Sequence, residues 1–297
     1  MNRRKFVTQA AGFGLTAAWP HYSFTGTKKP KYKMGYQLYS IRDEMAKDAI
    51  ATLKALKKMG YQDFEVYGFD AQAGTFYGHP SKEFKMILDD LDLTVTSGHY
   101  GFADYLDQSE ADLKRFVDAC IQAAKIIKSD YITWPWIAPE QRNIETFKRM
   151  TAKLNLIGEQ VNKAGLGFAY HNHGFEFDEH NGEHGYEIIL NETDPNLVKL
   201  QMDMYWVMHS AKVTPIALVD QHPGRFVMWH IKDMDVKTRD YTELGNGAIN
   251  YLNLLPDPEK SGLDYYYLEQ GGNFATSSMQ SAADSAAYFK KYLQQLF

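Results

Sequence analysis

The sequence predicts a single (β/α)8 barrel that follows an amino-terminal segment. Three observations support this fold class. Strand-like and helix-like patterns alternate about eight times after residue 32, the strand-like runs are almost continuously apolar, and the 297 residues suffice for a barrel of roughly 250. Continuous apolar strands are typical of parallel sheets covered on both faces. An open doubly wound sheet is the weaker alternative, because no G-x-G-x-x-G motif follows the first strand.

The predicted strands are short runs rich in β-branched, aromatic and aliphatic residues. They cover residues 33–39, 63–66, 93–97, 131–134, 166–171, 198–203, 226–231 and 265–269. A long glycine-rich loop follows the second strand and continues through residue 78. Alternation of such strands with helices predicts a parallel sheet, and eight repeats predict its closure into a barrel.

The predicted helices follow the strands in turn and cover residues 46–59, 81–91, 109–128, 144–164, 185–191, 214–220, 251–255 and 278–296. Gly60 and Gly165 each end one of them, because glycine readily adopts the backbone conformation that terminates a helix. The helix over 109–128 has one apolar face at helical spacing, formed by Leu113, Phe116, Val117, Cys120, Ala123, Ala124 and Ile127.

Composition excludes several classes of protein. The net charge is −5, so there is no overall basic field to attract nucleic acid or anionic lipid. Cys120 is the one cysteine, which rules out an internal disulfide and indicates a small buried apolar residue. We find no low-complexity region and no second domain beyond the barrel over 32–297.

The first 31 residues are interpreted as an export signal and a linker. Arg3 and Arg4 precede a short apolar stretch that ends in small residues, which is typical of a twin-arginine signal and a periplasmic protein in a bacterium. An ordinary basic amino terminus is the alternative. Stable membrane insertion is not expected, because the apolar run is shorter than the roughly 20 residues that span a bilayer.

Four predicted strands end in residues that commonly bind metals. His171, Asp203, His230 and Glu269 follow one another at intervals of 27 to 39 residues, about one strand–helix repeat each. Because the carboxyl ends of barrel strands meet at one mouth, we expect these side chains to converge there. For Asp203, which directly follows an apolar strand, the cap of a helix is the alternative. Two imidazoles and two carboxylates suit one divalent transition ion such as Mn²⁺, Zn²⁺ or Co²⁺.

Two neighbouring residues share a strand face with these candidates. His173 lies two residues after His171, and Lys232 lies two residues after His230. His173 is either a proton-transfer group or a polar rim residue. Lys232 either stabilises negative charge on a reacting oxygen or pairs with Asp233 or another neighbour. The flexible loop over 244–249 could bring backbone amides near a ligand.

Further residues are candidates to line the mouth and bind substrate. They are Gln37, Glu65, His99, Trp134, Glu176 and Trp206. Trp206 offers a flat wall for a sugar ring, although packing in the core is an equal interpretation. Each of the others, taken alone, is more often structural than functional.

The ensemble of short motifs resembles the xylose isomerase-like TIM barrel superfamily, in particular its sugar phosphate isomerase/epimerase branch. The resemblance covers roughly residues 33–297 and is carried by 171–177, 203–206, 230–233, 244–249 and Glu269. It implies a metal held by a Glu, an Asp, a His and a Glu at the ends of strands five to eight. Asp203, His230 and Glu269 match the last three, whereas His171 stands in the slot of the first glutamate. Trp206 stands where several epimerases have a substrate-binding histidine.

We therefore expect a metal-dependent enzyme that removes a proton next to a sugar carbonyl, with the metal stabilising the enediolate. Glu269 or His173 is the expected base, and Lys232 steadies the developing charge. With His171 in place of a glutamate, epimerisation by two facing carboxylates is in doubt, and β-elimination from a 3-keto-glycoside is the alternative. A non-catalytic carbohydrate-binding barrel and a phosphodiesterase of the endonuclease IV type are further alternatives. The expected partner is a small carbohydrate, not a nucleic acid, and a homo-oligomer stays open.

Overall fold

A computed structural model describes residues 31–297 of the protein. The predicted export signal and linker lie outside these residues, apart from Lys31. Eight parallel strands form one sheet in the order β6-β2-β1-β15-β12-β11-β8-β7. Their bounds are β1 Gly35–Gln37, β2 Asp63–Val66, β6 Thr94–Gly98, β7 Tyr131–Trp134, β8 Gly167–His171, β11 Lys199–Asp203, β12 Phe226–Ile231 and β15 Tyr265–Leu268.

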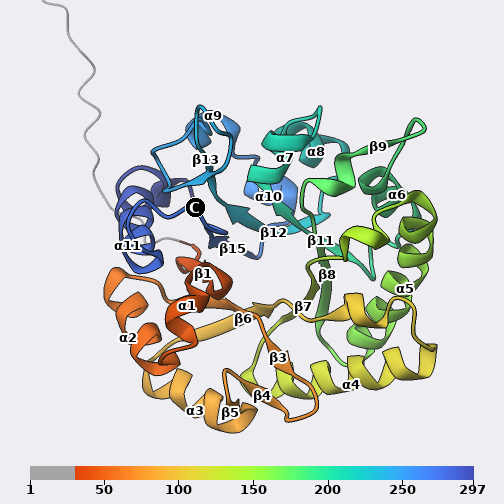
Figure 1. Cartoon of the computed structure of the whole chain (residues 1–297), viewed down its shortest axis with the longest axis horizontal. Coiled ribbons are helices and arrows are strands. Elements are labelled where there is room, and N and C mark those ends of the chain that lie inside the picture. The colour runs from red at the N-terminus through yellow and green to blue at the C-terminus, as the bar shows by residue number, and fades with distance from the viewer. Residues whose placement is uncertain (1–30) are drawn as a thin grey trace, which may run out of the picture.

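The two ends of the sheet, β6 and β7, meet along a short seam. A parallel bridge joins His99 to Thr133, and the backbone amide of Tyr100 donates to the Thr133 carbonyl over 3.0 Å. Nearer the amino ends of the strands, the Asp130 amide donates to the Thr96 carbonyl over 3.0 Å. The sheet is thus a nearly closed barrel with helices around its outside (Figure 1), which confirms the predicted (β/α)8 fold.

The helices begin where their sequences supply a capping side chain. Asp48, Ser109, Asn143 and Ser277 each accept a hydrogen bond from the first turn of α2, α4, α5 and α11. The bounds are α1 Arg42–Met45, α2 Ala49–Met59, α3 Ser81–Asp90, α4 Glu110–Ile127, α5 Ile144–Lys163, α6 Gly185–Glu192, α7 Met204–Ser210, α8 Pro215–Gln221, α9 Tyr251–Leu254, α10 Pro258–Ser261 and α11 Ser278–Tyr288. The apolar face of α4, Cys120 included, is buried as predicted.

Several segments differ from the sequence prediction. The strand predicted over 33–39 is limited to β1 and continues as a 3-10 turn over Leu38–Ile41. Two hairpins, β9 Glu179–His180 with β10 Glu183–His184 and β13 Asp233–Met234 with β14 Tyr241–Thr242, were not predicted, nor were α1 and α10. The loop after β2 contains a small antiparallel sheet of β3 Phe69–Asp70, β4 Thr75–Phe76 and β5 His79–Pro80. The helix predicted over 278–296 is α-helical only to Tyr288, and it continues as a π-helical turn over Phe289–Leu293 and a 3-10 turn over Gln294–Leu296. Helix α7 was not predicted, because Asp203 both ends β11 and caps α7 through the Trp206 amide (3.2 Å).

The barrel interior is layered. Ala169, Val227, Met228 and Tyr267 form an apolar cluster in the middle. Gly35 permits the close approach of β1 and β15, because a Cβ at this position would lie 2.1 Å from the Tyr266 carbonyl oxygen. Polar side chains occupy the carboxyl end above this cluster, and a smaller polar group around Asp63 lies below it.

The buried carboxyl of Asp63 links stability to pH. It accepts hydrogen bonds from the hydroxyls of Thr94 (2.6 Å) and Thr96, yet burial raises its pKa from 3.8 to about 7. The group therefore binds its proton more tightly in the folded chain than in the unfolded chain. Its stabilising contribution is complete below pH 4 and is lost as the pH rises toward 7.

Asp63→Asn is expected to remove this pH dependence. Relative to wild type, the free energy of unfolding of the variant should rise by about 1.3 kcal/mol from pH 5 to 6 and by about 1 kcal/mol from pH 6 to 7, where the carboxyl begins to ionise in the folded chain. Urea unfolding of both proteins at pH 5, 6 and 7 measures this difference, in which other titrating groups cancel. A difference that stays constant across the range would contradict the assignment.

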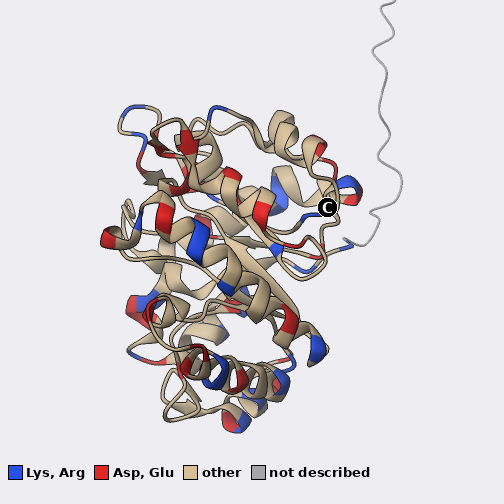
Figure 2. Ribbon diagram, turned by 90° about the vertical axis from the view of Figure 1, so that its right-hand side faces the viewer, with Lys and Arg blue, Asp and Glu red and all other residues tan. Residues whose placement is uncertain are grey.

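The outer surface carries both signs of charge. Acidic and basic residues are interspersed over the elements drawn in Figure 2. Among the described residues, no helix has the length and apolar character needed to cross a membrane.

Candidate functional site

The four predicted metal ligands lie at the carboxyl ends of four adjacent strands, β15, β12, β11 and β8. His230 Nδ1 lies 2.5 Å from Glu269 Oε2, and His171 Nε2 lies 3.6 Å from Asp203 Oδ2. One ligand atom each of Asp203, His230 and Glu269 lies within 4.8 Å of the others. The structure therefore brings together side chains that are as much as 98 residues apart in sequence.

The buried ammonium of Lys232 lies between two of these carboxylates. Its Nζ is 2.7 Å from Asp203 Oδ2 and 2.8 Å from Glu269 Oε2. Burial alone would lower the pKa of Lys232, but the two carboxylates raise it well above its ordinary value. Burial likewise favours the neutral form of Glu269, and Lys232 and His230 outweigh it and hold the pKa of that carboxyl well below normal. The lysine is thus a fixed positive charge at the floor of the mouth.

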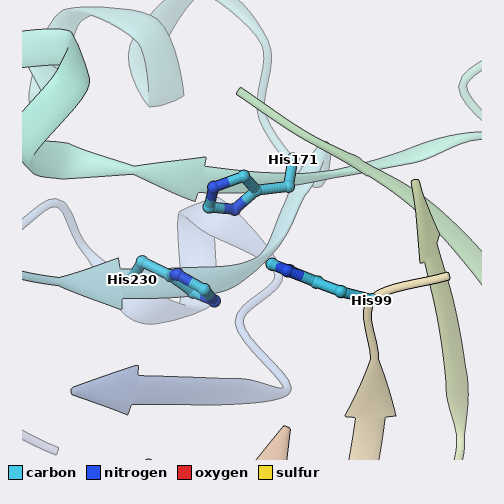
Figure 3. A group of neighbouring side chains, drawn as sticks. All are labelled: His99, His171 and His230. Atoms are coloured by element: carbon cyan, nitrogen blue, oxygen red, sulfur yellow. The ribbon is translucent and has the colours of Figure 1, made fainter. Parts of the chain in front are cut away.

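A third buried carboxylate, Glu65, contacts the imidazoles of His230 and His99. Figure 3 shows His99, His171 and His230 converging from separate strands. Glu65 Oε2 is 2.6 Å from His230 Nε2 and 3.0 Å from His99 Nε2. Burial opposes ionisation of Glu65, yet the two histidines hold its pKa well below normal. Glu65 therefore fixes the orientation of His230 from below, while Glu269 contacts the other ring nitrogen.

Gln201 on β11 completes this network. Its Oε1 accepts hydrogen bonds from His171 Nδ1 (2.9 Å) and His99 Nε2 (2.8 Å), and its Nε2 donates to Glu65 Oε1 (2.6 Å). Because an amide oxygen only accepts, the proton of His171 resides on Nδ1 and its Nε2 presents a lone pair toward Asp203. Sequence reasoning missed Gln201, although it shares a strand face with Asp203 two residues later.

These donors fit a divalent ion. His171 Nδ1 is held by Gln201 and its Nε2 faces Asp203, an arrangement usual in histidines that bind metals. His230 is held by Glu65 at Nε2, and its Nδ1 contacts Glu269, so an ion bound there would replace the proton between the two groups. Asp203 Oδ2 is buried, and although Lys232 is close, no donor among the described residues is aligned with it for a hydrogen bond. Two imidazole nitrogens and two carboxylates are ligands that Mn²⁺, Zn²⁺ and Co²⁺ accept.

A cavity of about 710 Å³ opens above this floor. Its polar lining includes His99, His171, His173, Lys232 and Glu269, so the three predicted catalytic residues all line it. His173 Nδ1 has no hydrogen-bond partner among the described residues. Burial, together with the charge of Lys232, lowers the pKa of His173 to about 3, which keeps its imidazole neutral. Cavities of this size bind small organic ligands.

Two predicted substrate-binding residues lie beneath the cavity instead of on its wall. Gln37 and Glu65 are fully buried, and Gln37 Nε2 donates to Glu65 Oε2 over 2.5 Å. Of the candidates on the first three strands, His99 is the one that reaches the cavity. Gln37 and Glu65 can therefore orient the imidazoles but do not contact the cavity.

Three other predicted substrate-binding residues also lie off the cavity wall. Trp134 is fully buried and stacks on Phe102 in the core. Glu176 accepts hydrogen bonds from the Tyr170 hydroxyl (2.8 Å) and the His173 amide (2.9 Å), so it holds the loop that carries His173. Trp206 packs beside two residues that line the cavity, with ring centroids 5.9 Å from His173 and 6.0 Å from Tyr241, and does not line it itself.

The glycine-containing loop over 244–249 uses its amides internally. The backbone amides of Gly245, Gly247 and Ile249 donate to the carboxylate of Asp233 over 2.9 to 3.1 Å. A Cβ at Gly247 would lie 2.2 Å from Asp233 Oδ1, so only glycine permits this approach. The loop amides are therefore committed to Asp233 instead of a ligand, and Lys232 pairs with Asp203 and Glu269 instead of Asp233.

The fold and the site define an α/β barrel whose polar groups gather at the carboxyl ends of its strands. A family model described as xylose isomerase-like TIM barrel matches residues 53–291. The chain belongs to this family, as its short motifs indicated. A search of curated proteins found no match to this chain.

Several solved structures are similar to this chain. A sugar phosphate isomerase/epimerase from Parabacteroides distasonis ATCC 8503 is 26% identical, covers 93% of this chain and 99% of its own, and has a TM-score of 0.77. A second from the same organism is 24% identical, covers 89% and 99%, and has a TM-score of 0.76. The IOLI protein with a binding zinc atom is 16% identical, covers 89% and 99%, and shares the fold with a TM-score of 0.67.

Proposed function

We propose that the protein is a metal-dependent enzyme of the sugar isomerase/epimerase type that removes a proton next to a sugar carbonyl. One observation carries the proposal: His173, Lys232 and Glu269 line the same cavity, and Glu269 forms one compact group of possible metal ligands with Asp203 and His230, beside His171. Membership of the xylose isomerase-like family and the likeness to a sugar phosphate isomerase/epimerase support the reaction class.

Each residue has a role that follows from its surroundings. A divalent ion held by His171, Asp203, His230 and Glu269 would supply Lewis acidity toward a sugar carbonyl. Glu269, kept ionised by Lys232 and His230, or His173, kept neutral by burial, would accept the proton. The ammonium of Lys232 would stabilise negative charge that develops on a substrate oxygen, because it is fixed and buried before the reaction begins.

A second candidate outcome is β-elimination from a 3-keto-glycoside at the same site. His171 occupies the position where the epimerases carry a glutamate, and its Nδ1 proton is engaged by Gln201. The two groups that face the cavity as proton acceptors, Glu269 and His173, differ in charge, whereas epimerisation through two carboxylates needs a matched pair. This asymmetry favours removal of one proton followed by loss of a leaving group.

Proton NMR in D₂O tests the proposal and separates the outcomes. The protein is loaded in turn with Mn²⁺, Zn²⁺ and Co²⁺ and mixed with a panel of neutral ketoses, aldoses and 3-keto-glycosides. Isomerisation or epimerisation exchanges one carbon-bound proton for deuterium, and elimination releases the aglycone. The paramagnetic ions are removed by chelation before spectra are recorded. Binding of these sugars without exchange or release under any condition would indicate a carbohydrate-binding barrel and overturn the proposed enzyme.

A further inference from the structure

The mouth of the barrel is divided into two unlike halves. The proposed reactive residues come from β8, β11, β12 and β15, which are consecutive in the sheet. The loops after the other four strands, β1, β2, β6 and β7, line the opposite side of the cavity. That side contributes none of the proposed ligands or bases. A ligand that fills the whole cavity would therefore contact the proposed reactive residues at one end and the loops after β1, β2, β6 and β7 at the other.

This second surface is largely aromatic. We call it the aromatic arc, and it consists of Tyr39, Tyr67, Phe69, Tyr100 and Trp136. At least one of these residues comes from the loop after each of β1, β2, β6 and β7. Flat aromatic rings bind the apolar faces of sugar rings by excluding water from both surfaces. The arc thus has the chemistry of a carbohydrate-binding surface at a distance from the reactive groups.

Two rings of the arc are unusually exposed. The exposed fractions of Tyr39 and Trp136 are 44% and 40%, although most large aromatic side chains of the barrel are buried. The guanidinium of Arg42 lies 4.3 Å from the centroid of the Tyr39 ring, and that of Arg142 lies 5.5 Å from the Trp136 ring. Cation–π contacts of this kind hold the rings in place. Exposed rings with fixed orientations lose little entropy when a ligand stacks on them.

The charges on the side of the aromatic arc disfavour a phosphorylated group there. Lys232 is the one lysine or arginine among the described residues that line it, and both nearby carboxylates already pair with this ammonium. Arg42 and Arg142 instead donate to the backbone carbonyls of Tyr39 and Ile137. The remaining acidic group on this side is Asp104, which repels an anion. An uncharged ligand therefore fits this side of the cavity better than a sugar phosphate.

We propose that the aromatic arc is a second carbohydrate subsite, so that the substrate is an uncharged glycoside of at least two sugar rings. This inference rests on the proposed function for the position of the reacting ring. The cavity of about 710 Å³ lies in the upper part of the range that holds drug-sized ligands, so it has room for more than one pyranose ring. The ring beside the reacting one would stack on Tyr39 or Trp136.

Calorimetric titration of the metal-loaded protein tests the subsite. The probes are methyl glucoside, glucose 6-phosphate, and the methyl glycosides of four glucose disaccharides with α-1,4, α-1,6, β-1,4 and β-1,6 linkages. We expect at least one disaccharide to bind about tenfold more tightly than methyl glucoside. Tyr39→Ala and Trp136→Ala should each reduce that preference about tenfold, the usual loss when an aromatic anchor is truncated. Tyr292→Ala is the matched control, because its ring is 41% exposed and does not line the cavity.

The outcomes separate the subsite from the proposed function. Tighter binding of glucose 6-phosphate than of methyl glucoside, or no preference for any disaccharide, would overturn the subsite. The subsite would also be overturned if Tyr39→Ala and Trp136→Ala weakened the binding of methyl glucoside and of the disaccharides by the same factor. Proton exchange on a monosaccharide, with no preference for binding a disaccharide, would support the proposed function and contradict the subsite. A preference for a disaccharide that depends on Tyr39 and Trp136, without proton exchange on any sugar, would support the subsite and contradict the proposed function.

Discussion

Replacing Glu269 by glutamine is expected to slow proton exchange at the substrate carbon by about 10²- to 10⁴-fold, the usual contribution of a general base. The carboxylate lines the cavity, and Lys232 and His230 keep it ionised despite its burial. Glutamine preserves the size of the side chain and its amide oxygen can still accept a hydrogen bond from Lys232, but it cannot act as a base. Deuterium incorporation followed by NMR, with thermal unfolding as a check on the fold, measures the effect.

Two further variants test whether Glu269 itself is the base. Glu243→Gln is the matched control, because Glu243 is a buried carboxylate that accepts the Ala275 amide (2.9 Å) and does not line the cavity. We expect its exchange rate to stay within a few-fold of wild type. His173→Gln tests the other acceptor. Exchange at the wild-type rate in Glu269→Gln, together with loss of exchange in His173→Gln, would transfer the role of base to His173.

The second large effect concerns the metal. Asp203→Ala and His230→Ala are each expected to weaken binding of the divalent ion by more than about 100-fold, because loss of residues that merely support ligands already costs about 10- to 100-fold. Each variant removes one of four donors and leaves a buried partner, Lys232 or Glu65, with fewer contacts of opposite charge. Elemental analysis after dialysis against Mn²⁺, Zn²⁺ or Co²⁺ measures occupancy directly.

A histidine outside the site serves as the control. His222 ends α8, away from the cavity, so His222→Ala should bind the ion as the wild type does. Asp203→Ala also removes the N-cap of α7, at a cost of about 1 kcal/mol, and its thermal unfolding is therefore recorded alongside. Full occupancy in both Asp203→Ala and His230→Ala would contradict the assigned ligand set.

The fold was predictable because each strand–helix repeat has its own local pattern, an apolar strand-like run followed by a helical pattern. The strands over 131–134 and 226–231 have the predicted bounds, since both are short runs rich in aromatic and β-branched residues. The convergence of His171, Asp203, His230 and Glu269 was also predictable, because equivalent ends of parallel strands must meet at one mouth. A repeated position in a repeated unit carries spatial information that a single residue lacks.

The rest of the site depends on neighbours that sequence spacing does not reveal. Whether Glu65 lines a cavity or lies beneath it is decided by His99 and His230, which come from other strands. Gln201 carries no chemistry of its own that marks it as functional, and its role appears only when two imidazoles are seen to share its oxygen. The aromatic arc is assembled from loops whose conformations depend on contacts far along the chain.

The shared oxygen of Gln201 constrains how this barrel can be redesigned. Replacing His171 by glutamate would recreate the pair of carboxylates that the resemblance to epimerases implies. It would also place a second acceptor beside Gln201 Oε1, which now accepts a hydrogen bond from His171 Nδ1 over 2.9 Å. Two lone pairs would then face each other in a buried setting. Reprogramming the reaction therefore requires a compensating change at residue 201, and a mutational library that varies position 171 alone would discard the productive combinations.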